Sequence, residues 1–273
     1  MQSLERKIIK VNGHKVPLLI IKPCQQADRV PVVVWFHGGG YVLGNERLVF
    51  LGRAYGLVER FGVTVVSVGY RLAPWHRYPA ALEDCYGGLL YVKKNAEKLG
   101  VDANQIMIGG ESAGGGLTCA TAILARDRKE VDVKYMMPLY PMIDHLDTPS
   151  SCNNHNKVWN TRRNHFGWNM YLGKEARENV SPYASPARLK DFHGLPNAYT
   201  FVCTEEPFYD ETVTWFEKLK EAGVDARVDV YPGLYHAFDM LEPRRKESLL
   251  AIKRFEENFA RVLEEMKRRQ EES

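Results

Sequence analysis

The sequence predicts an α/β protein with a mostly parallel central sheet, and three observations support this prediction. Short apolar runs rich in β-branched residues alternate with segments of helical spacing along most of the chain. An Asn-Gly pair separates the first two runs, as in an antiparallel hairpin. The chain ends in a long amphipathic segment. Because 273 residues, 45% of them hydrophobic, can bury one full core, we expect a single domain over residues 1–273.

The predicted strands begin with a hairpin. Lys7–Val11 and Val16–Ile21 flank Asn12-Gly13, which supplies the positive φ angles of a two-residue turn. Buried strands are then predicted at Val30–Phe36, Val63–Val68, Gln105–Ile108, Tyr135–Leu139, Tyr199–Cys203 and Ala226–Tyr231. Because helical segments separate most of these strands, they should lie parallel to one another.

The predicted helices should cover both faces of this sheet. Helical spacing occurs at Ala80–Leu99, Ser112–Arg126 and Thr212–Ala222. The closing segment carries an apolar face and charged residues opposite; that face comprises Leu249, Ile252, Phe255, Phe259, Val262 and Met266. This pattern predicts a C-terminal helix docked on the sheet.

One segment, 144–182, interrupts the alternation of strands and helices. It is long and polar, and it contains Trp159 and Trp168 among Asn, His and Arg residues. Loops of this length inside a compact domain are usually functional. We therefore expect a small lid or cap insertion at about 144–182.

Composition excludes several classes of function. The formal charge of +3 is small and the basic residues are dispersed, so no nucleic-acid partner is expected. The longest apolar stretch, Val30–Phe36, is too short to cross a bilayer, and Met1–Lys10 has no apolar signal core. We expect a cytoplasmic protein with no membrane partner. The cysteines are too far apart for a disulfide framework or a Cys-based zinc site: Cys24, Cys85, Cys119, Cys152 and Cys203.

A glycine-rich turn after a predicted strand is the first candidate for chemistry. Gly110-Glu111-Ser112-Ala113-Gly114 fits G-x-S-x-G, the pattern of a serine exposed at a sharp strand-to-helix turn. The glycines would give the clearance that such a turn requires. The helix that follows would place partial positive charge beside the hydroxyl, which suits a developing anion. A phosphate-binding loop is excluded because no Lys-Ser or Lys-Thr follows the glycines.

A serine that attacks a carbonyl needs donors for the oxyanion, and a second glycine run supplies them. His37-Gly38-Gly39-Gly40 ends the strand Val30–Phe36, where such a loop belongs. We expect the backbone N–H groups of Gly39, Gly40 and Ala113 to form the oxyanion hole, with Gly38 as a further candidate. His37 comes with the glycines, so it should shape the loop rather than act as the base.

After the serine, the acid should come next along the chain, and the histidine base should follow it. His236 lies between the strand Ala226–Tyr231 and the C-terminal helix, in Gly-Leu-Tyr-His-Ala-Phe, and it is the candidate base. Two carboxylates follow the strand ending at Cys203. Glu206, directly before a proline, is the first choice for the acid, and Asp210 is the second. The acid would hold the imidazole in the correct tautomer.

Five motifs occur in order between residues 30 and 240: His-Gly-Gly-Gly-Tyr at 37–41, Tyr-Arg-Leu-Ala-Pro at 70–74, Gly-Glu-Ser-Ala-Gly-Gly at 110–115, Ser-Pro-Tyr-Ala at 181–184, and Gly-Leu-Tyr-His-Ala-Phe at 233–238. With these motifs the sequence resembles the hormone-sensitive-lipase-like family of bacterial carboxylesterases, within the α/β-hydrolase fold. The resemblance implies that Ser112 is the nucleophile and His236 the base. It also shows departures: Glu206 stands where the family usually has aspartate, Trp75 replaces a usual glutamate, and the family's N-terminal helical cap is not expected.

The motifs predict a serine esterase that forms an acyl enzyme and needs no metal or other cofactor. A small-molecule ester is the expected partner, with acyl chains from acetyl to butyryl or slightly longer. Tyr41, Trp159 and Trp168 are the expected walls of the acyl pocket. An amidase, formamidase or peptidase on the same scaffold, and a non-catalytic ligand-binding relative, remain alternatives. The sequence leaves the natural alcohol and the enantioselectivity open, and a homodimer is compatible with the resemblance.

Overall fold

The structure, a computed structural model, describes residues 2–24, 29–173 and 179–272. Within these ranges one sheet has the strand order β1-β2-β4-β3-β5-β6-β7-β8. The strands are β1 (Gln2–Val11), β2 (His14–Pro23), β3 (Val30–Phe36), β4 (Thr64–Val68), β5 (Val101–Glu111), β6 (Tyr135–Leu139), β7 (Asn197–Cys203) and β8 (Ala226–Tyr231). β2 is antiparallel to β1 and β4, and the other neighbours are parallel. The predicted fold class is thereby confirmed.

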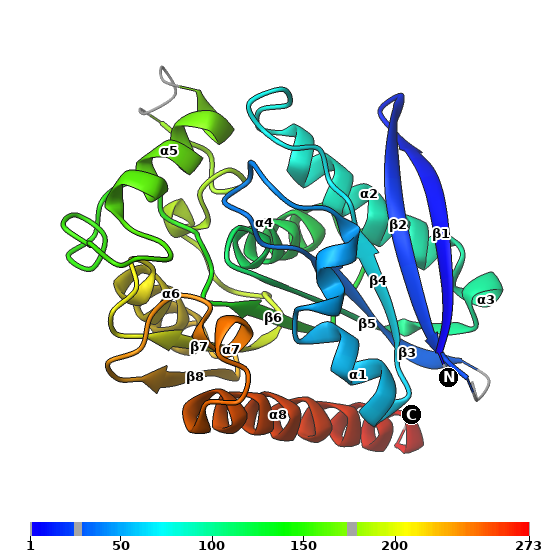
Figure 1. Ribbon diagram of the computed structural model, residues 1–273. Helices are drawn as coiled ribbons and strands as arrows, with labels where there is room; N and C mark the ends of the chain where they lie inside the picture. Colours follow the sequence, from blue (N-terminus) through cyan, green and yellow to red (C-terminus); the bar gives the residue numbers. More distant parts are fainter. Residues whose placement is uncertain (1, 25–28, 174–178, 273) are drawn as a thin grey trace.

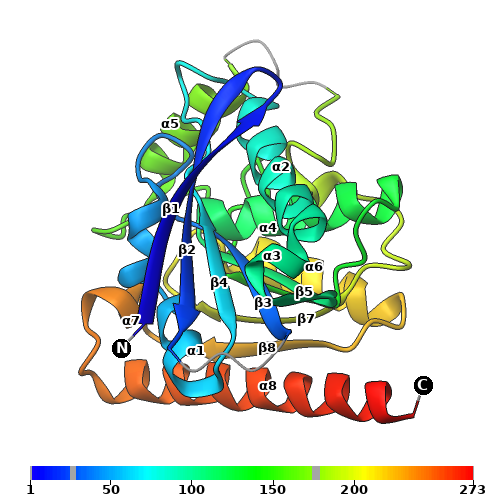
Figure 2. The ribbon, with the colours of Figure 1, turned by 90° about the vertical axis from the view of Figure 1, so that its right-hand side faces the viewer.

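The N-terminal hairpin forms the edge of this sheet (Figures 1 and 2). Its turn residues Asn12 and Gly13 have φ angles of 47° and 81°, the left-handed pair that the Asn-Gly sequence predicts. The register pairs Val11 with His14 and continues outward to Gln2 and Pro23. The two strands are therefore longer than the apolar pattern alone indicates.

Helices cover both faces of the sheet (Figures 1 and 2). They are α1 (Ala54–Phe61), α2 (Ala80–Lys94), α3 (Ala96–Leu99), α4 (Ala113–Arg128), α5 (Thr161–Leu172), α6 (Tyr209–Glu221), α7 (Phe238–Leu241) and α8 (Lys246–Glu271), with 3₁₀ turns η1 (Glu46–Phe50) and η2 (Pro186–Arg188). Buried residues of α1 and α8 share one apolar cluster, and those of α2, α4 and α6 share another. Alternate residues of β3 join each cluster, as the two-residue period of a strand requires.

Three helical details differ from the sequence prediction. The helix expected at Ala80–Leu99 is broken at Asn95, whose side-chain amide donates to the Tyr91 carbonyl at 2.9 Å. The sequence does not predict the short helices α1 and α7. The segment 144–182 is not simply a loop, because α5 lies within it. Asn160 caps the start of this helix, and its side chain accepts from the Arg163 N–H.

The described residues give two further observations on the whole fold. None of their helices combines the length and the apolar character that a membrane span requires. The five cysteines form no disulfide; Cys24 and Cys152 are exposed and the other three are buried. Since both observations concern the folded chain alone, they leave its cellular location as a prediction.

Candidate active site

Ser112 occupies the sharp turn between β5 and α4. Its φ and ψ angles of 57° and −120° are strained for a residue with a side chain. Three backbone hydrogen bonds hold this conformation. The Ser112 N–H donates to the Leu139 carbonyl, and its own carbonyl accepts from the N–H groups of Gly116 and Met142, all at 3.0 Å. The hydroxyl is thus fixed at the carboxyl end of β5.

The glycines around Ser112 provide clearance for neighbouring backbone. A Cβ atom at Gly110 would lie 2.4 Å from the carbonyl oxygen of Phe36, and one at Gly114 would lie 2.0 Å from the same atom. Real Cβ atoms do not approach a carbonyl so closely, so α4 can start beside β3 only with glycine here.

A chain of hydrogen bonds connects Ser112 to the predicted base and to the first-choice acid. His236 Nε2 lies 2.9 Å from the Ser112 Oγ, and His236 Nδ1 lies 2.5 Å from the Glu206 Oε2. The other oxygen of Glu206 accepts from the Cys203 N–H at 2.7 Å. All three side chains are buried, with exposed fractions of 8%, 4% and 0% for Ser112, His236 and Glu206. Since a carboxylate only accepts, Nδ1 donates to Glu206 and Nε2 is left to accept from the serine hydroxyl.

Asp210, the second choice for the acid, lies in a different environment. It stands in the first turn of α6, and its Oδ2 accepts from the Ser150 N–H at 2.6 Å. The Ser150 hydroxyl in turn accepts from the Asp210 N–H at 3.1 Å. Asp210 therefore ties the start of α6 to the 144–182 segment, while Glu206 contacts the histidine.

The His37-Gly38-Gly39-Gly40 loop lies directly beside Ser112. A Cβ atom on Gly38 would come within 3.5 Å of the Ser112 Cβ. Gly39 and Gly40 have φ angles of 122° and 59°, which glycine adopts without strain. In the described residues, no backbone carbonyl accepts from the N–H groups of Gly38, Gly39 or Gly40. The loop can therefore present donors toward a carbonyl oxygen at Ser112.

His37 shapes this loop, as its sequence position indicates. Its ring stacks on Tyr70 with centroids 4.1 Å apart, and Nδ1 lies 2.7 Å from the Gly38 carbonyl. The Tyr70 hydroxyl donates to the His37 carbonyl at 2.7 Å. Burial lowers the pKa of His37 to about 4, so the ring is neutral near pH 7.

Aromatic rings surround His236, and only one of the three predicted pocket walls is among them. The rings found beside His236 in the described residues are those of Tyr140, Phe208 and Trp159, at 5.0, 5.0 and 6.4 Å between centroids. Sequence reasoning missed Tyr140 and Phe208. Their positions just past the ends of β6 and β7 are the signal that could have found them, since parallel strands end at the same edge.

The other two predicted walls are interior residues. Tyr41 is 1% exposed, stacks on Tyr171 with centroids 4.1 Å apart, and donates to the Met142 carbonyl at 2.8 Å. Trp168 is 4% exposed and packs against Tyr41. Trp159, in contrast, lies so close to Gly40 that a Cβ atom there would be 2.3 Å from the indole.

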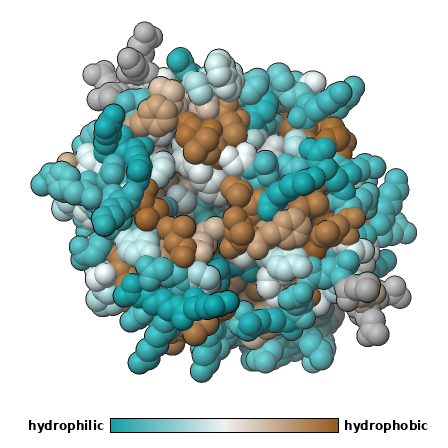
Figure 3. Space-filling model, in the orientation of Figure 1, coloured by the Kyte–Doolittle hydropathy of each residue, from teal (hydrophilic) through white to brown (hydrophobic). Residues whose placement is uncertain are grey.

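The face of the molecule seen in Figure 1 carries apolar surface across its middle (Figure 3). Large apolar side chains are exposed near the site in the chain: Leu43 just after the glycine loop, Leu51 after η1, and Leu241 in α7, at 69%, 63% and 57%. Exposed apolar groups beside a functional site are typical of sites that bind apolar ligands.

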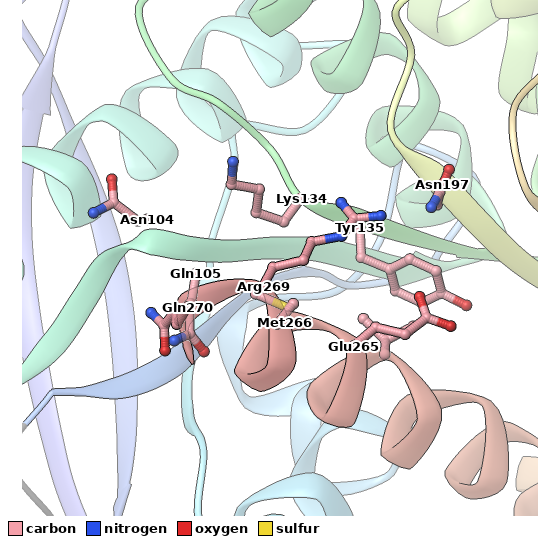
Figure 4. A pocket seen from close by; sticks show the side chains of 10 residues that line it. Asn104, Gln105, Lys134, Tyr135, Asn197, Glu265, Met266, Arg269 and Gln270 are labelled. Atoms are coloured by element: carbon pink, nitrogen blue, oxygen red, sulfur yellow. The ribbon is translucent and has the colours of Figure 1, made fainter. Parts of the chain in front are cut away.

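A cavity of about 210 Å³ lies at the other end of the parallel strands, away from Ser112. Figure 4 shows Tyr135 and Asn197, which begin β6 and β7, facing Arg269 and Glu265 of α8. Because Ser112, His236 and Glu206 all follow the carboxyl ends of strands, this cavity is separate from the site described above.

Comparison with known proteins places the chain in a family. A family model described as the alpha/beta hydrolase fold matches residues 33–240. An arylesterase of Saccharolobus solfataricus is 32% identical over 235 residues, which are 84% of this chain and 75% of the relative. A carboxylesterase of Mycobacterium tuberculosis is 31% identical over 265 residues, 92% of this chain and 82% of the relative.

Solved structures give the same result. A bacterial heroin esterase matches with a TM-score of 0.85 and 32% identity, over 93% of this chain and 84% of the other. A hyperthermophilic esterase of Pyrobaculum calidifontis matches with a TM-score of 0.85 and 35% identity, over 93% of this chain and 81% of the other. The matched range, the fold and the five motifs all indicate the same family. The chain therefore belongs to the α/β-hydrolase-fold family, in its hormone-sensitive-lipase-like branch.

Proposed function

We propose that this protein is a serine carboxylesterase that hydrolyses short-chain acyl esters through Ser112, His236 and Glu206. The single observation that carries the proposal is the hydrogen-bond chain from the Ser112 Oγ through His236 to Glu206. A nucleophile, a base and an orienting acid in this order are what acyl transfer requires. The relatives named arylesterase, carboxylesterase and heroin esterase support ester hydrolysis as the reaction.

In the proposed mechanism, His236 takes the hydroxyl proton of Ser112 as its oxygen attacks the ester carbonyl. The C–O bond to the alcohol then breaks, and His236 returns the proton to the leaving alcohol. Water, deprotonated by His236, attacks the acyl enzyme, and the acid leaves as Ser112 regains its proton. Glu206 accepts from Nδ1 throughout and stabilises the imidazolium.

Backbone N–H groups would stabilise the oxyanion. We propose Gly39, Gly40 and Ala113 for this role, with Gly38 as a further candidate. Ala113 begins α4, so no residue of its own helix can accept from its N–H. A single donor of an oxyanion hole contributes about 10²–10³ in kcat in a studied protease, so several backbone donors supply a large part of the rate.

Trp159 supports the preference for short acyl chains. Its indole lies against Gly40 and its ring centre is 6.4 Å from that of His236, so it occupies space next to the reacting carbonyl. The other two predicted walls, Tyr41 and Trp168, are buried and pack on each other. Acetyl to butyryl chains, or slightly longer ones, fit this arrangement better than long fatty acyl chains.

The test is hydrolysis of p-nitrophenyl acetate, butyrate, octanoate and decanoate by the purified protein and by Ser112→Ala. Turnover should be highest for the short esters, and Ser112→Ala should lower kcat by about 10⁶, the effect of removing a catalytic serine in a related mechanism. Ser67→Ala is the matched control, because Ser67 is a fully buried serine of β4 whose hydroxyl has no hydrogen-bond partner in the described residues. Equal inactivity of wild type and Ser112→Ala would sink the proposal.

A further inference from the structure

Two buried carboxylates flank the catalytic pair in sequence and are not used by the proposed mechanism. Glu111 directly precedes Ser112, and Asp239 is the third residue after His236. Their exposed fractions are 5% and 0%. Burying a carboxylate is unfavourable unless it has partners, so their contacts decide what they do. One residue, Arg53 at the start of α1, contacts both.

Glu111 is held by groups from two other elements. The Trp35 indole N–H donates to its Oε2 at 2.7 Å, and the backbone N–H of Arg53 donates to its Oε1 at 3.1 Å. A Cβ atom at Gly52 would lie 2.1 Å from the same Oε1, so the backbone can approach only because residue 52 is glycine. The turn that carries Ser112 is thereby fastened to the start of α1.

Asp239 depends on the side chain of Arg53. The Arg53 Nε lies 3.1 Å from the Asp239 Oδ2, with exposed fractions of 11% and 0% for the two side chains. The Arg53 Nη2 also donates to the Asp239 carbonyl at 3.4 Å. Within the described residues, Arg53 is the ion-pair partner of Asp239. The loop that carries His236 is thereby fastened to the same point.

We propose that Arg53 is a positioning residue that sets the distance between Ser112 and His236. The inference rests on the proposed function. Ser112 and His236 are 124 positions apart and sit on separate elements, so their contact needs a common support. The backbone N–H of Arg53 donates to Glu111, the residue before Ser112, and the Arg53 side chain pairs with Asp239, which follows His236. A misplacement of about 1 Å between reacting groups can lower a rate about 10²-fold.

Mutations can separate the backbone contact of Arg53 with Glu111 from its side-chain contact with Asp239. Replacing the Arg53 side chain leaves its backbone N–H to Glu111 in place, and Asp239→Asn removes the countercharge while keeping nearly the same volume. We expect Asp239→Asn to lower kcat for p-nitrophenyl acetate at least tenfold, with KM within about twofold of wild type. Arg53→Lys, which keeps a cation near Asp239, should retain more activity than Arg53→Met.

Asp84→Asn is the matched control for a merely structural effect. Asp84 is also 0% exposed and pairs with an arginine, Arg71, through hydrogen bonds of 2.8 and 2.9 Å. It belongs to α2 and has no proposed role in the chemistry. Both Asn variants should lower Tm because each removes a buried countercharge from an arginine. Only Asp239→Asn should lower kcat.

The rates must be counted per functional serine, so each variant is titrated with a fluorophosphonate, which labels the activated hydroxyl. A lower labelling rate in Asp239→Asn, beside a normal one in Asp84→Asn, supports the proposal. Labelling and kcat per serine within twofold of wild type in Asp239→Asn overturn it, whatever happens to Tm. If wild type labels at Ser112 but hydrolyses no ester, the esterase proposal fails while the labelling rates still test Arg53. A wild type that neither labels nor hydrolyses overturns both.

Discussion

At the residue scale, the contacts of Glu206 support its proposed role as the acid, at a position where the family usually has aspartate. One carboxylate oxygen accepts from the Cys203 N–H and the other reaches His236, so the longer side chain is fixed at both oxygens. Fixing matters because an acid that can rotate does not hold the imidazole in one tautomer. Asp210 does not contact the histidine in this way, since its carboxylate accepts from the Ser150 N–H.

This difference predicts unequal effects of two conservative substitutions. Glu206→Gln should lower kcat for p-nitrophenyl butyrate by about 10⁴, because an amide at this position favours the wrong histidine tautomer. Asp210→Asn should lower kcat less than tenfold, since its role is to anchor the 144–182 segment. Steady-state kinetics of the two variants decide the matter. A larger loss in Asp210→Asn would show that the acid is assigned to the wrong residue.

At the element scale, the two glycine-rich turns depend on atoms that lie far away in sequence. Gly114→Ala would place a Cβ atom 2.0 Å from the Phe36 carbonyl oxygen, so α4 must move away from β3. We expect a loss of about 1–3 kcal/mol in the free energy of unfolding, together with a large fall in kcat. Gly56→Ala is the control, because Gly56 lies within α1 and its Cβ would meet nothing within 4 Å.

Alanine favours a helix over glycine by about 0.5–1 kcal/mol, so Gly56→Ala should be slightly more stable than wild type with unchanged kcat. Urea unfolding of both variants measures the difference. Equal stability of the two variants would mean that the close approach at Gly114 can relax without penalty.

Trp159 gives a prediction about the loop that precedes α5. Trp159→Ala removes the indole that lies against Gly40 and opens space next to His236. The ratio of kcat/KM for p-nitrophenyl octanoate to that for the acetate should rise several-fold. Trp75→Ala serves as the control, because Trp75 is 85% exposed. An unchanged ratio in Trp159→Ala would remove this residue from the acyl pocket.

The sequence predicted elements best where one local rule was sufficient. Asn12-Gly13 determined the hairpin turn, and β-branched runs marked β3 and β8. The sequence missed α5 because its buried residues, such as Trp168 and Tyr171, are few among polar ones. It also could not find Arg53, because the contacts of this residue come from β5 and α7, and no local pattern encodes such distant partners.

At the scale of the whole molecule, the sheet separates two apolar clusters, and the candidate site residues lie at the carboxyl ends of its parallel strands. Ser112, Glu206 and His236 follow β5, β7 and β8, and their order at that edge comes from parallel strands of one sheet. The site is therefore only as stable as the packing of both faces. Buried ionisable groups beneath it, such as Glu111 and His37, make that stability depend on pH.

The contribution of Glu111 to this pH dependence has a definite sign. Burial raises the pKa of Glu111 to about 7, from 4.5 in the unfolded chain. Between these values the folded state binds the proton more strongly, so the contribution of Glu111 to stability falls as pH rises from about 4.5 to 7. His37 acts in the opposite direction: its pKa is lowered to about 4, so its contribution is lost as pH falls below about 6.5.

Glu111→Gln removes the first contribution and leaves the second. From pH 5 to 7 the free energy of unfolding of this variant should therefore rise relative to wild type, by about 2 kcal/mol, because one pKa unit corresponds to about 1.4 kcal/mol. Above pH 8 the difference should be constant. A loss of stability from the altered contacts to Trp35 and Arg53 would be the same at every pH. The test is therefore how the difference in free energy of unfolding between variant and wild type changes with pH. Urea unfolding at pH 5, 6, 7 and 8 measures it, and a difference that is the same at all four values would show that Glu111 is ionised throughout.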